Sequence, residues 1–367
     1  MGTTTHPDRN QEATDAVLES LLEAAEHTLT MDAIYVGHRL GYYDALWRSG
    51  PITAAELAAE TETNERYARE WLEHGTVVGL LECENPAASG DDRRYDLPES
   101  AVEVFCDPDS ENYLAPIASL VVGVGRPIED VLEAFRTGGG VPFEAYGDPL
   151  REGQAAMNRP GFLHQLGPDW LASIPDVDAR LREGGRVADI GCGHGWSSIG
   201  LARHYPDVTV DGVDLDRASI ERARENAIDD GLEDRVRFHH RDAADLETGR
   251  DGEYDLAMAL ECVHDLSDPV GVLETMRRLV GEDGTVLVVD ERTSETFTPQ
   301  GNEIEALLYG FSVLHCLPAG MADRPSAETG TVMRESTLRA YATDAGFETV
   351  EVLPIEHFFF RFYRLVP

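Results

Sequence analysis

The chain has 367 residues, more than one ordinary domain needs, so we expect two domains. Apolar residues make up 42% of it, which excludes a disordered chain. No apolar run approaches the roughly 20 residues that cross a bilayer, and the first residues lack a signal-peptide pattern. Five scattered cysteines without a CxxC pair predict neither a disulfide framework nor a zinc site. We therefore expect a cytoplasmic protein with no metal and no membrane contact.

The charge is strongly one-sided. The chain has 30 basic and 69 acidic residues, for a formal net charge of −39, and it contains no lysine. This composition resembles that of proteins from extreme halophiles, in which high salt screens the repulsion between acidic side chains. An acidic protein from an ordinary environment is the alternative. In either case the charge argues against a nucleic-acid partner or an anionic membrane.

The N-terminal region, residues 1–105, has the pattern of a winged helix. Residues 1 to about 15 are polar and predicted to fray, and helical spacing of apolar residues follows from Ala16 to Tyr43. Thr53 with Glu56 predicts a capping box, and Asn64 predicts the start of the next helix. The expected helices and short strands are Ala54–Ala59, Glu65–Val78, Leu80–Cys83 and Arg94–Leu97.

A connector, residues 106–175, leads to a C-terminal domain in residues 176–367 where strands and helices alternate. Alternation of this kind predicts a doubly wound α/β sheet of the Rossmann type. The expected strands are Arg186–Ile190, Thr209–Val213, Val236–His240, Tyr254–Leu260, Thr285–Val289, Thr349–Leu353 and Phe358–Leu365. An insertion at about 297–334 precedes the last helix.

A glycine loop follows the first of these strands. Gly191, Gly193 and Gly195 allow the backbone to turn tightly and to approach a ligand without a Cβ clash. Asp214 ends the second strand, where a ribose-binding acid lies in a doubly wound fold, and Asp242 follows the third. An ordinary strand–helix turn is the alternative for a glycine trio alone, but the acids at the next two strand ends make a nucleotide-type site the better prediction.

This GxGxG loop with a strand-end acid resembles the class I S-adenosylmethionine-dependent methyltransferases. The resemblance implies that Asp189 lies near the methionyl end of the cofactor and that Asp214, with Leu215 beside it, binds the ribose. It also implies that Asp242 binds the adenine amino group, with Ala243 as a backbone neighbour. A nicotinamide-dependent oxidoreductase is less favoured because Trp196 occupies the position of the third glycine of GxGxxG.

A candidate base follows the fourth strand. The run Val263-His264-Asp265-Leu266-Ser267-Asp268 resembles the motif of plant phenolic O-methyltransferases, in which the histidine removes the proton of the acceptor hydroxyl. An imidazole of ordinary pKa suits that role at neutral pH. His264 could instead be a structural hydrogen-bonding group. Glu261 is predicted to contact the cofactor amine or the pocket, or else to pair with an arginine.

Two further segments resemble parts of a prokaryotic methyltransferase group with an N-terminal winged helix. The insertion would form part of a substrate lid, which makes Tyr309, His315 and Met333 candidate pocket residues. The connector segment Phe143–Phe162 resembles the stretch that joins the two domains of O-methyltransferases and closes over the cofactor, so residues 106–175 are expected to form a helical cover of the cofactor or substrate. Phe143 and Tyr146 would pack on the cofactor. For all five side chains, packing in the core is the alternative reading.

The winged helix itself could bind DNA or form a dimer interface. Residues 1–100 carry seven arginines against 20 acidic side chains, a net charge of −13, whereas DNA binding needs cations at the phosphates. The resemblance implies a homodimer through this domain. We therefore expect an enzyme that methylates a small molecule, most simply at a hydroxyl oxygen, with carbon and nitrogen acceptors left open. The alternative function is a transcription regulator that binds S-adenosylmethionine as a ligand.

Overall fold

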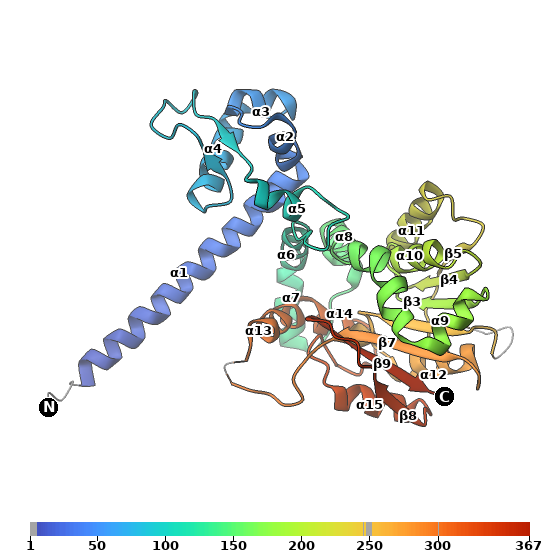
Figure 1. The fold of residues 1–367 in the computed structure, drawn as a ribbon. Coiled ribbons are helices and arrows are strands. Elements are labelled where there is room, and N and C mark those ends of the chain that lie inside the picture. Colours follow the sequence, from blue (N-terminus) through green and yellow to red (C-terminus); the bar gives the residue numbers. More distant parts are fainter. Residues whose placement is uncertain (1–5, 245, 247–251, 300) are drawn as a thin grey trace. The chain divides into compact units, whose positions relative to one another are not determined.

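The structure is a computed structural model that describes residues 6–367 except 245, 247–251 and 300. The chain divides into two compact units, residues 1–122 and 123–367. The boundary falls within α6 (Ile117–Gly125). Figure 1 shows the chain coloured from blue at its N-terminus to red at its C-terminus.

The first unit is mainly helical, with a small two-stranded antiparallel wing. The Thr53–Glu56 capping box and the Asn64 cap are confirmed, because the side chains of Thr53 and Asn64 accept backbone N–H groups of α3 and α4. The wing pairs Glu82 with Asp96 and Cys83 with Tyr95. Its elements are α1 (His6–Arg39), α2 (Tyr42–Ser49), α3 (Ala54–Glu60), α4 (Glu65–Val77), β1 (Glu82–Cys83), β2 (Tyr95–Asp96) and α5 (Val102–Phe105).

The prediction for the N-terminal helix was wrong at both ends. Helix α1 begins at His6, within the stretch expected to fray, and ends at Arg39. The stretch before Ala16 includes Gln11, Glu12 and Ala13, which are good helix formers and extend the helix although their side chains are exposed. Gly41, in the left-handed conformation, separates α1 from α2.

Aromatic packing on Trp71 forms the centre of the first unit. The rings of Tyr42 and Tyr43 meet the Trp71 ring edge-on at centroid distances of 5.0 and 5.2 Å. The indole N–H of Trp71 donates to the carbonyl of Ala33 at 2.7 Å. A Cβ at Gly37 would lie 2.2 Å from this indole, so only glycine allows α1 to approach it so closely.

The second unit contains a seven-stranded sheet of order β5-β4-β3-β6-β7-β9-β8, in which β9 is antiparallel to both neighbours. This confirms the doubly wound α/β prediction, with strand ends shifted by up to two residues. The strands are β3 (Arg186–Ile190), β4 (Thr209–Asp214), β5 (Val236–His240), β6 (Leu256–Leu260), β7 (Thr285–Glu291), β8 (Thr349–Val352) and β9 (Phe360–Val366).

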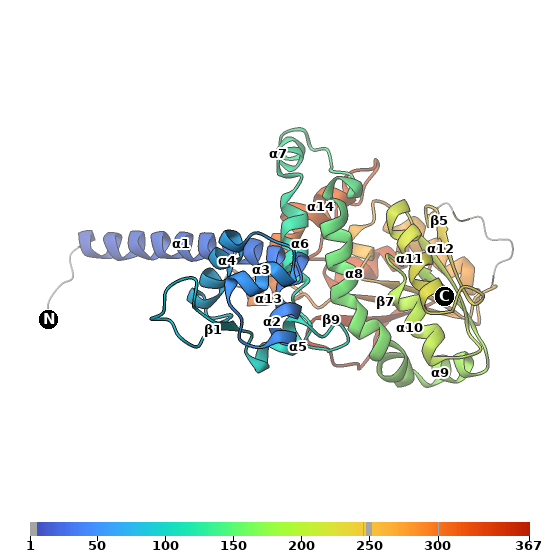
Figure 2. The same cartoon turned by 90° about the horizontal axis from the view of Figure 1, so that it is seen from above.

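Helices cover both faces of this sheet. Side chains alternate along β3, so that Val187 packs with α9, α10 and α11 while Ala188 and Ile190 pack with α12 and α15. Helix α8 runs beside α10 (Figure 2). The helices of this unit are α7 (Ile128–Thr137), α8 (Gly147–His164), α9 (Pro175–Arg182), α10 (Trp196–His204), α11 (Arg217–Asp229), α12 (Pro269–Val280), α13 (Glu303–Phe311), α14 (Leu317–Gly320) and α15 (Glu335–Asp344).

Candidate active site

A cavity of about 890 Å³ opens at the carboxyl ends of the parallel strands of the second unit. In an open α/β sheet this is the edge where ligands bind. Seven residues that the sequence predicts for cofactor binding line it: Gly191, Gly193, Asp214, Leu215, Asp242, Ala243 and Glu261. The segments that carry them follow β3, β4, β5 and β6, and together they form what we call the cleft floor.

The glycine loop has the tight geometry that its sequence predicts. Gly191 has φ +70°, and a Cβ there would lie 2.7 Å from the Cys262 sulfur. Gly195 has φ +80°, and a Cβ there would lie 2.4 Å from the ring of Phe238. A Cβ at Gly193 would meet no atom within 4 Å, so this backbone borders open space. The loop therefore turns through conformations and contacts that favour glycine and presents its backbone to the cavity.

Asp214 is held by backbone N–H groups. Its carboxylate accepts from the N–H of Gly193 at 2.8 Å and from that of Asp216 at 2.8 Å. Burial raises its pKa, and these two N–H groups oppose the rise. The carboxylate is therefore fixed between the glycine loop and the start of α11, at the end of β4.

Asp189 lies behind the cavity wall. It is 1% exposed, and the hydroxyls of Ser197 and Ser198 both donate to its Oδ2 at 2.6 Å. Burial raises its pKa to about 6, against these two hydrogen bonds. Neither Asp189 nor Gly195 is among the lining residues. Asp189 ties β3 to the first turn of α10, and its contact with the cofactor stays a prediction.

His264 is also buried, at 3% exposed, and the cavity wall beside it is formed by Asp265. Its Nδ1 lies 2.6 Å from Asp290 Oδ1 and 3.0 Å from Glu291 Oε2. Its Nε2 lies 3.2 Å from Asp265 Oδ1. Three carboxyl groups therefore surround one imidazole, two of them at the carboxyl end of β7. Asp290 and Glu291 cannot be assigned to this cluster from the sequence, because their proximity to His264 depends on the pairing of β6 with β7.

The protonation of this cluster follows from its burial. Burial alone would lower the pKa of His264, but Glu291, Asp265 and Asp290 raise it well above its usual value. The imidazolium in turn lowers the pKa of Asp290, against the effect of burial, whereas burial raises that of Glu291. The imidazolium therefore favours the ionised form of Asp290, while burial and the neighbouring Asp290 carboxylate favour the neutral form of Glu291. One ligand atom each of His264, Asp290 and Glu291 lies within 4.8 Å of the others, a metal-type donor set that was not expected.

Two family matches cover most of the chain. Residues 181–317 match the family described as "Methyltransferase domain", and residues 28–105 match "Rv2258c-like winged HTH domain". The first match contains the glycine loop, both strand-end acids and His264. The second unit carries an S-adenosylmethionine-dependent methyltransferase domain.

Curated relatives of this methyltransferase domain match part of the chain. A ubiquinone biosynthesis O-methyltransferase of Aromatoleum aromaticum is 29% identical over 202 residues, which cover 53% of this chain and 76% of that protein. The 27-O-demethylrifamycin SV methyltransferase of Amycolatopsis mediterranei is 34% identical over 110 residues, 30% of this chain and 40% of that protein.

Solved methyltransferases share the fold over almost the whole chain. The mitomycin 7-O-methyltransferase MmcR has a TM-score of 0.70 at 22% identity and covers 97% of this chain and 99% of its own. Human N-acetylserotonin methyltransferase, solved with S-adenosylmethionine, has a TM-score of 0.66 at 18% identity and covers 100% and 99%. At 22% and 18% identity, these similarities establish a shared fold and not a shared substrate.

The residues of the methyltransferase cleft fit its cofactor. Asp214 and Asp242 stand at adjacent strand ends, where the ribose and the adenine amino group would be bound. The open space at Gly193 leaves room beside the loop. Carboxylates also suit a ligand that carries a sulfonium cation and an amine but no phosphate. The acidic floor therefore agrees with this cofactor better than with a dinucleotide.

The lid residues predicted for the methyltransferase pocket do not line this cavity. His315 is buried and packs on the ring of Tyr146 at a centroid distance of 4.4 Å. Met333 is buried in the core on the face of the sheet that α12 and α15 cover. The hydroxyl of Tyr309 accepts a hydrogen bond from Arg334. Of the two connector aromatics, Phe143 lines the cavity and Tyr146 does not. The insertion contributes other residues to the wall: Ala319, Ala322 and Asp323.

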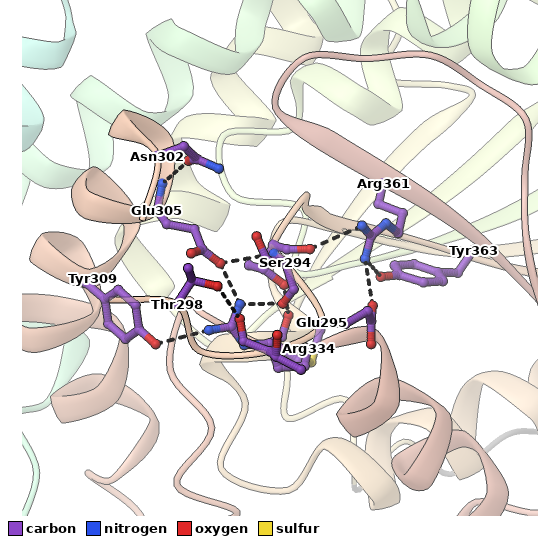
Figure 3. Close-up of polar contacts among 12 residues, drawn as sticks. Ser294, Glu295, Thr298, Asn302, Glu305, Tyr309, Arg334, Arg361 and Tyr363 are labelled. Atoms are coloured by element: carbon purple, nitrogen blue, oxygen red, sulfur yellow. Dashed lines mark hydrogen bonds and ion pairs between the residues drawn. The ribbon is translucent and has the colours of Figure 1, made fainter. Parts of the chain in front are cut away.

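A polar network joins the two ends of the insertion, near Ser294 and Arg334, and we call this region the neck of the insertion (Figure 3). Arg334 pairs with Glu305, and its guanidinium also donates to the carbonyl of Ser294. The backbone N–H of Ser294 donates to Glu305 at 3.0 Å, and the hydroxyl of Thr293 donates to the carbonyl of Met333 at 2.7 Å. The chain entering the insertion is therefore fixed to the chain leaving it.

Helix α8, which lies almost wholly in the connector segment expected to close over the cofactor, forms a second wall of the cavity, although none of its residues was singled out from the sequence. Its residues Arg151, Gln154, Ala155 and Asn158 line the cavity, and we call this face the cleft roof. Their spacing of three, one and three residues places them on one side of a helix. That spacing is visible in the sequence, but the partners of the individual side chains depend on packing against distant segments.

Proposed function

We propose that the chain transfers the methyl group of S-adenosylmethionine to a hydroxyl oxygen of a small molecule. The observation that carries the proposal is the cavity whose floor joins the glycine loop, Asp214 and Asp242 on one side to Glu261 and Asp265 on the other. S-adenosylmethionine supplies an activated methyl group as a sulfonium. Relatives named as O-methyltransferases support oxygen as the acceptor.

The chain's own contribution to this reaction is orientation and removal of the acceptor proton. Asp265 reaches the cavity, and His264, 3.2 Å behind it, is the proposed base. In this account the hydroxyl proton passes to Asp265 and from there to the neutral form of His264. Because the surrounding carboxyl groups raise the pKa of His264, that form gains population at higher pH than it would in an ordinary imidazole. We therefore expect the rate to keep rising with pH above neutrality.

Methyl transfer from labelled S-adenosylmethionine to a panel of phenols and naphthols, in molar potassium chloride, tests the proposal. His264→Ala should lower turnover about tenfold or more and leave the affinity for S-adenosylhomocysteine unchanged by calorimetry. Asp290→Asn should lower the pKa of His264 and move the rise of the pH–rate profile to lower pH. Unchanged turnover in His264→Ala would remove the histidine from the mechanism.

The N-terminal unit is proposed to form a homodimer. Helix α1 carries an apolar stripe that is more than half exposed within this chain: Val17, Leu18, Leu21, Leu22 and Leu29. Such a stripe at helical spacing is typical of a helix that packs against a partner. Light scattering in molar potassium chloride should give a dimer that Leu18→Glu with Leu22→Glu dissociates. A wild-type monomer would contradict the proposal.

Regulation of transcription is the second candidate, because residues 28–105 match a winged helix–turn–helix family. The arginines of α4, however, are already paired with acids: Arg66 with Glu70, and Arg69 with Glu65 and Asp91. Few cations remain for phosphates. A shift of upstream DNA in a gel, weakened by salt, would favour this candidate over catalysis alone.

A halophilic cytoplasm is the proposed setting. The absence of lysine, the net charge of −39 and five free thiols support it. Dilution from molar potassium chloride should then lower the free energy of unfolding, because screening of the acidic surface is lost. A free energy of unfolding that does not depend on salt would contradict this setting.

A further inference from the structure

Two polar contacts join the cleft roof to the cleft floor. Arg151 and Asn158 are seven residues apart on α8, on the face that lines the cavity. Each reaches an acid at the end of a strand, Arg151 to Asp216 beyond β4 and Asn158 to Glu261 beyond β6. Gln154 lies between them on the same face.

The first contact is a bidentate ion pair between Arg151 and Asp216. Arg151 Nε and Nη2 donate to the two carboxylate oxygens of Asp216 at 2.8 and 2.9 Å, and the two side chains are 9% and 11% exposed. Asp216 also caps α11 through the backbone N–H of Ser219, and its own N–H holds Asp214. Arg151 therefore acts on the ribose-binding acid through Asp216. Paired, charge-assisted bonds of this geometry are strong and directional.

The second contact lies on the other side of the glycine loop. The side-chain amide of Asn158 donates to Glu261. Glu261 has φ +53°, a conformation that costs free energy in a residue other than glycine. The chain bends there directly after β6, which brings the carboxyl group to the cavity wall. Asn158 is the partner that the structure gives to this strained acid.

The spacing of the two contacts matches the sheet beneath. Strand β3 lies between β4 and β6, so the two acids are separated by two strand spacings, about 9.6 Å. Seven residues of an α-helix rise about 10.5 Å. Helix α8 thus crosses the carboxyl end of β3 with one contact on each side. A ligand on the glycine loop lies beneath this crossing.

The two ends of α8 are held differently. At its C-terminal end, a Cβ on Gly200 of α10 would lie 2.1 Å from the carbonyl oxygen of Phe162, so the helices touch backbone to backbone. Pro160, two residues earlier, removes a helical N–H and weakens the helix at that point. The N-terminal end begins at Gly147, with φ +71°. Motion of α8 would therefore pivot near Pro160, and residues 147–158 would lift from the floor.

From these contacts we infer that Arg151 and Asn158 are positioning residues that hold α8 closed over the bound cofactor and set how slowly it leaves. The inference rests on the cofactor site alone and is independent of the acceptor and of His264. Both contacts must break before residues 147–158 can lift, whereas a cofactor that enters an open cleft meets neither. Loss of either contact should therefore act on dissociation more than on association.

Release of tritiated S-adenosylhomocysteine into an excess of unlabelled ligand, in molar potassium chloride, measures this rate. Arg151→Gln and Asn158→Ala should each release the ligand about tenfold faster, with association changed less than about twofold. Arg151→Lys keeps the positive charge but cannot form the bidentate contact with Asp216, so its release rate should lie between those of the wild type and Arg151→Gln. Arg203→Gln is the matched control. This variant breaks the ion pair of Arg203 with Asp230, neither of which lines the cavity. The ligand should leave this variant at the wild-type rate.

Two further measurements separate this role from a general effect on folding. Asp216→Asn keeps a side chain that can cap α11, and combined with Arg151→Gln it should speed release no more than Arg151→Gln alone. Without ligand, amide hydrogens of residues 147–158 should exchange faster in both α8 variants, while those of α10 keep their wild-type rates.

Release rates within twofold of wild type in folded Arg151→Gln and Asn158→Ala would overturn the inference. Amide exchange in residues 147–158 that is unchanged in these variants would also overturn it. Because this exchange is measured without ligand, it gives a result even for a variant that binds the ligand poorly. A wild-type protein that binds no S-adenosylhomocysteine would instead contradict the cofactor assignment itself.

Discussion

The floor and the roof of the cleft are held in place by different means. The floor consists of short turns at adjacent strand ends, where backbone conformation and close packing fix Gly191, Gly195 and Asp214. The roof is one face of α8, joined to the floor by the side chains of Arg151 and Asn158. Damage to the floor should therefore affect folding and binding together. Damage to the roof should change how long a ligand stays.

Gly191→Ala should have the largest effect, because it damages the floor. A Cβ at this position would lie 2.7 Å from the sulfur of Cys262, and φ is +70°. Overpacking and strain together should lower the free energy of unfolding by about 3 kcal/mol and remove cofactor binding. Gly231→Ala is the matched control, since its φ is +66° but a Cβ would meet no atom within 4 Å. It should cost about 1 kcal/mol in urea unfolding. Equal losses would refute packing as the cause.

Glu261 gives a pH-dependent test at the place where roof meets floor. Burial raises its pKa to about 7 from an ordinary value near 4.5. Between these pH values the folded protein binds more protons than the unfolded chain, so this group lowers stability as the pH rises from 4.5 to 7. Glu261→Gln should remove about 3 kcal/mol of that fall. Urea unfolding at pH 4.5 and 7.5, at one salt concentration, measures it. A fall identical to that of the wild type would show that Glu261 ionises normally.

A substitution in the neck of the insertion should have the smallest effect on the free energy of unfolding and on cofactor binding, because this region lies outside the cleft floor. Arg334→Gln breaks the pair with Glu305, whose side chains are 14% and 4% exposed, and should cost about 1 kcal/mol of unfolding free energy. The exposed pair of Arg222 with Glu225 is the control, and Arg222→Gln should cost less than about 0.5 kcal/mol. Calorimetry should find the affinity of Arg334→Gln for S-adenosylhomocysteine within about twofold of wild type. A larger loss would mean that the neck also positions the floor.

The difference between floor and roof also explains what the sequence could predict. The strands, the glycine loop and the positions of Asp214 and Asp242 at strand ends follow from local signals that lie together in the chain. The long helix α1 was misjudged because its first turns have helical propensity without an apolar pattern. No described helix is both long and apolar enough to cross a membrane.

The contacts around His264 and on α8 could not be predicted in the same way. Asp290 reaches His264 through the pairing of β6 with β7, over a separation of 26 residues. Asn158 reaches Glu261 over 103 residues. Residue types and spacing do not specify such partners, because they depend on how strands and helices pack. His264 therefore had the right motif, while its burial could be learned only from the structure.

Titration calorimetry with S-adenosylhomocysteine tests the central claim most directly, with the wild type compared to Asp214→Asn in molar potassium chloride. The account predicts one ligand per chain for the wild type and an affinity at least about tenfold lower for the variant, since a charged acceptor for the ribose hydroxyls is lost. Equal affinity in both proteins, or no binding by the folded wild type, would contradict it.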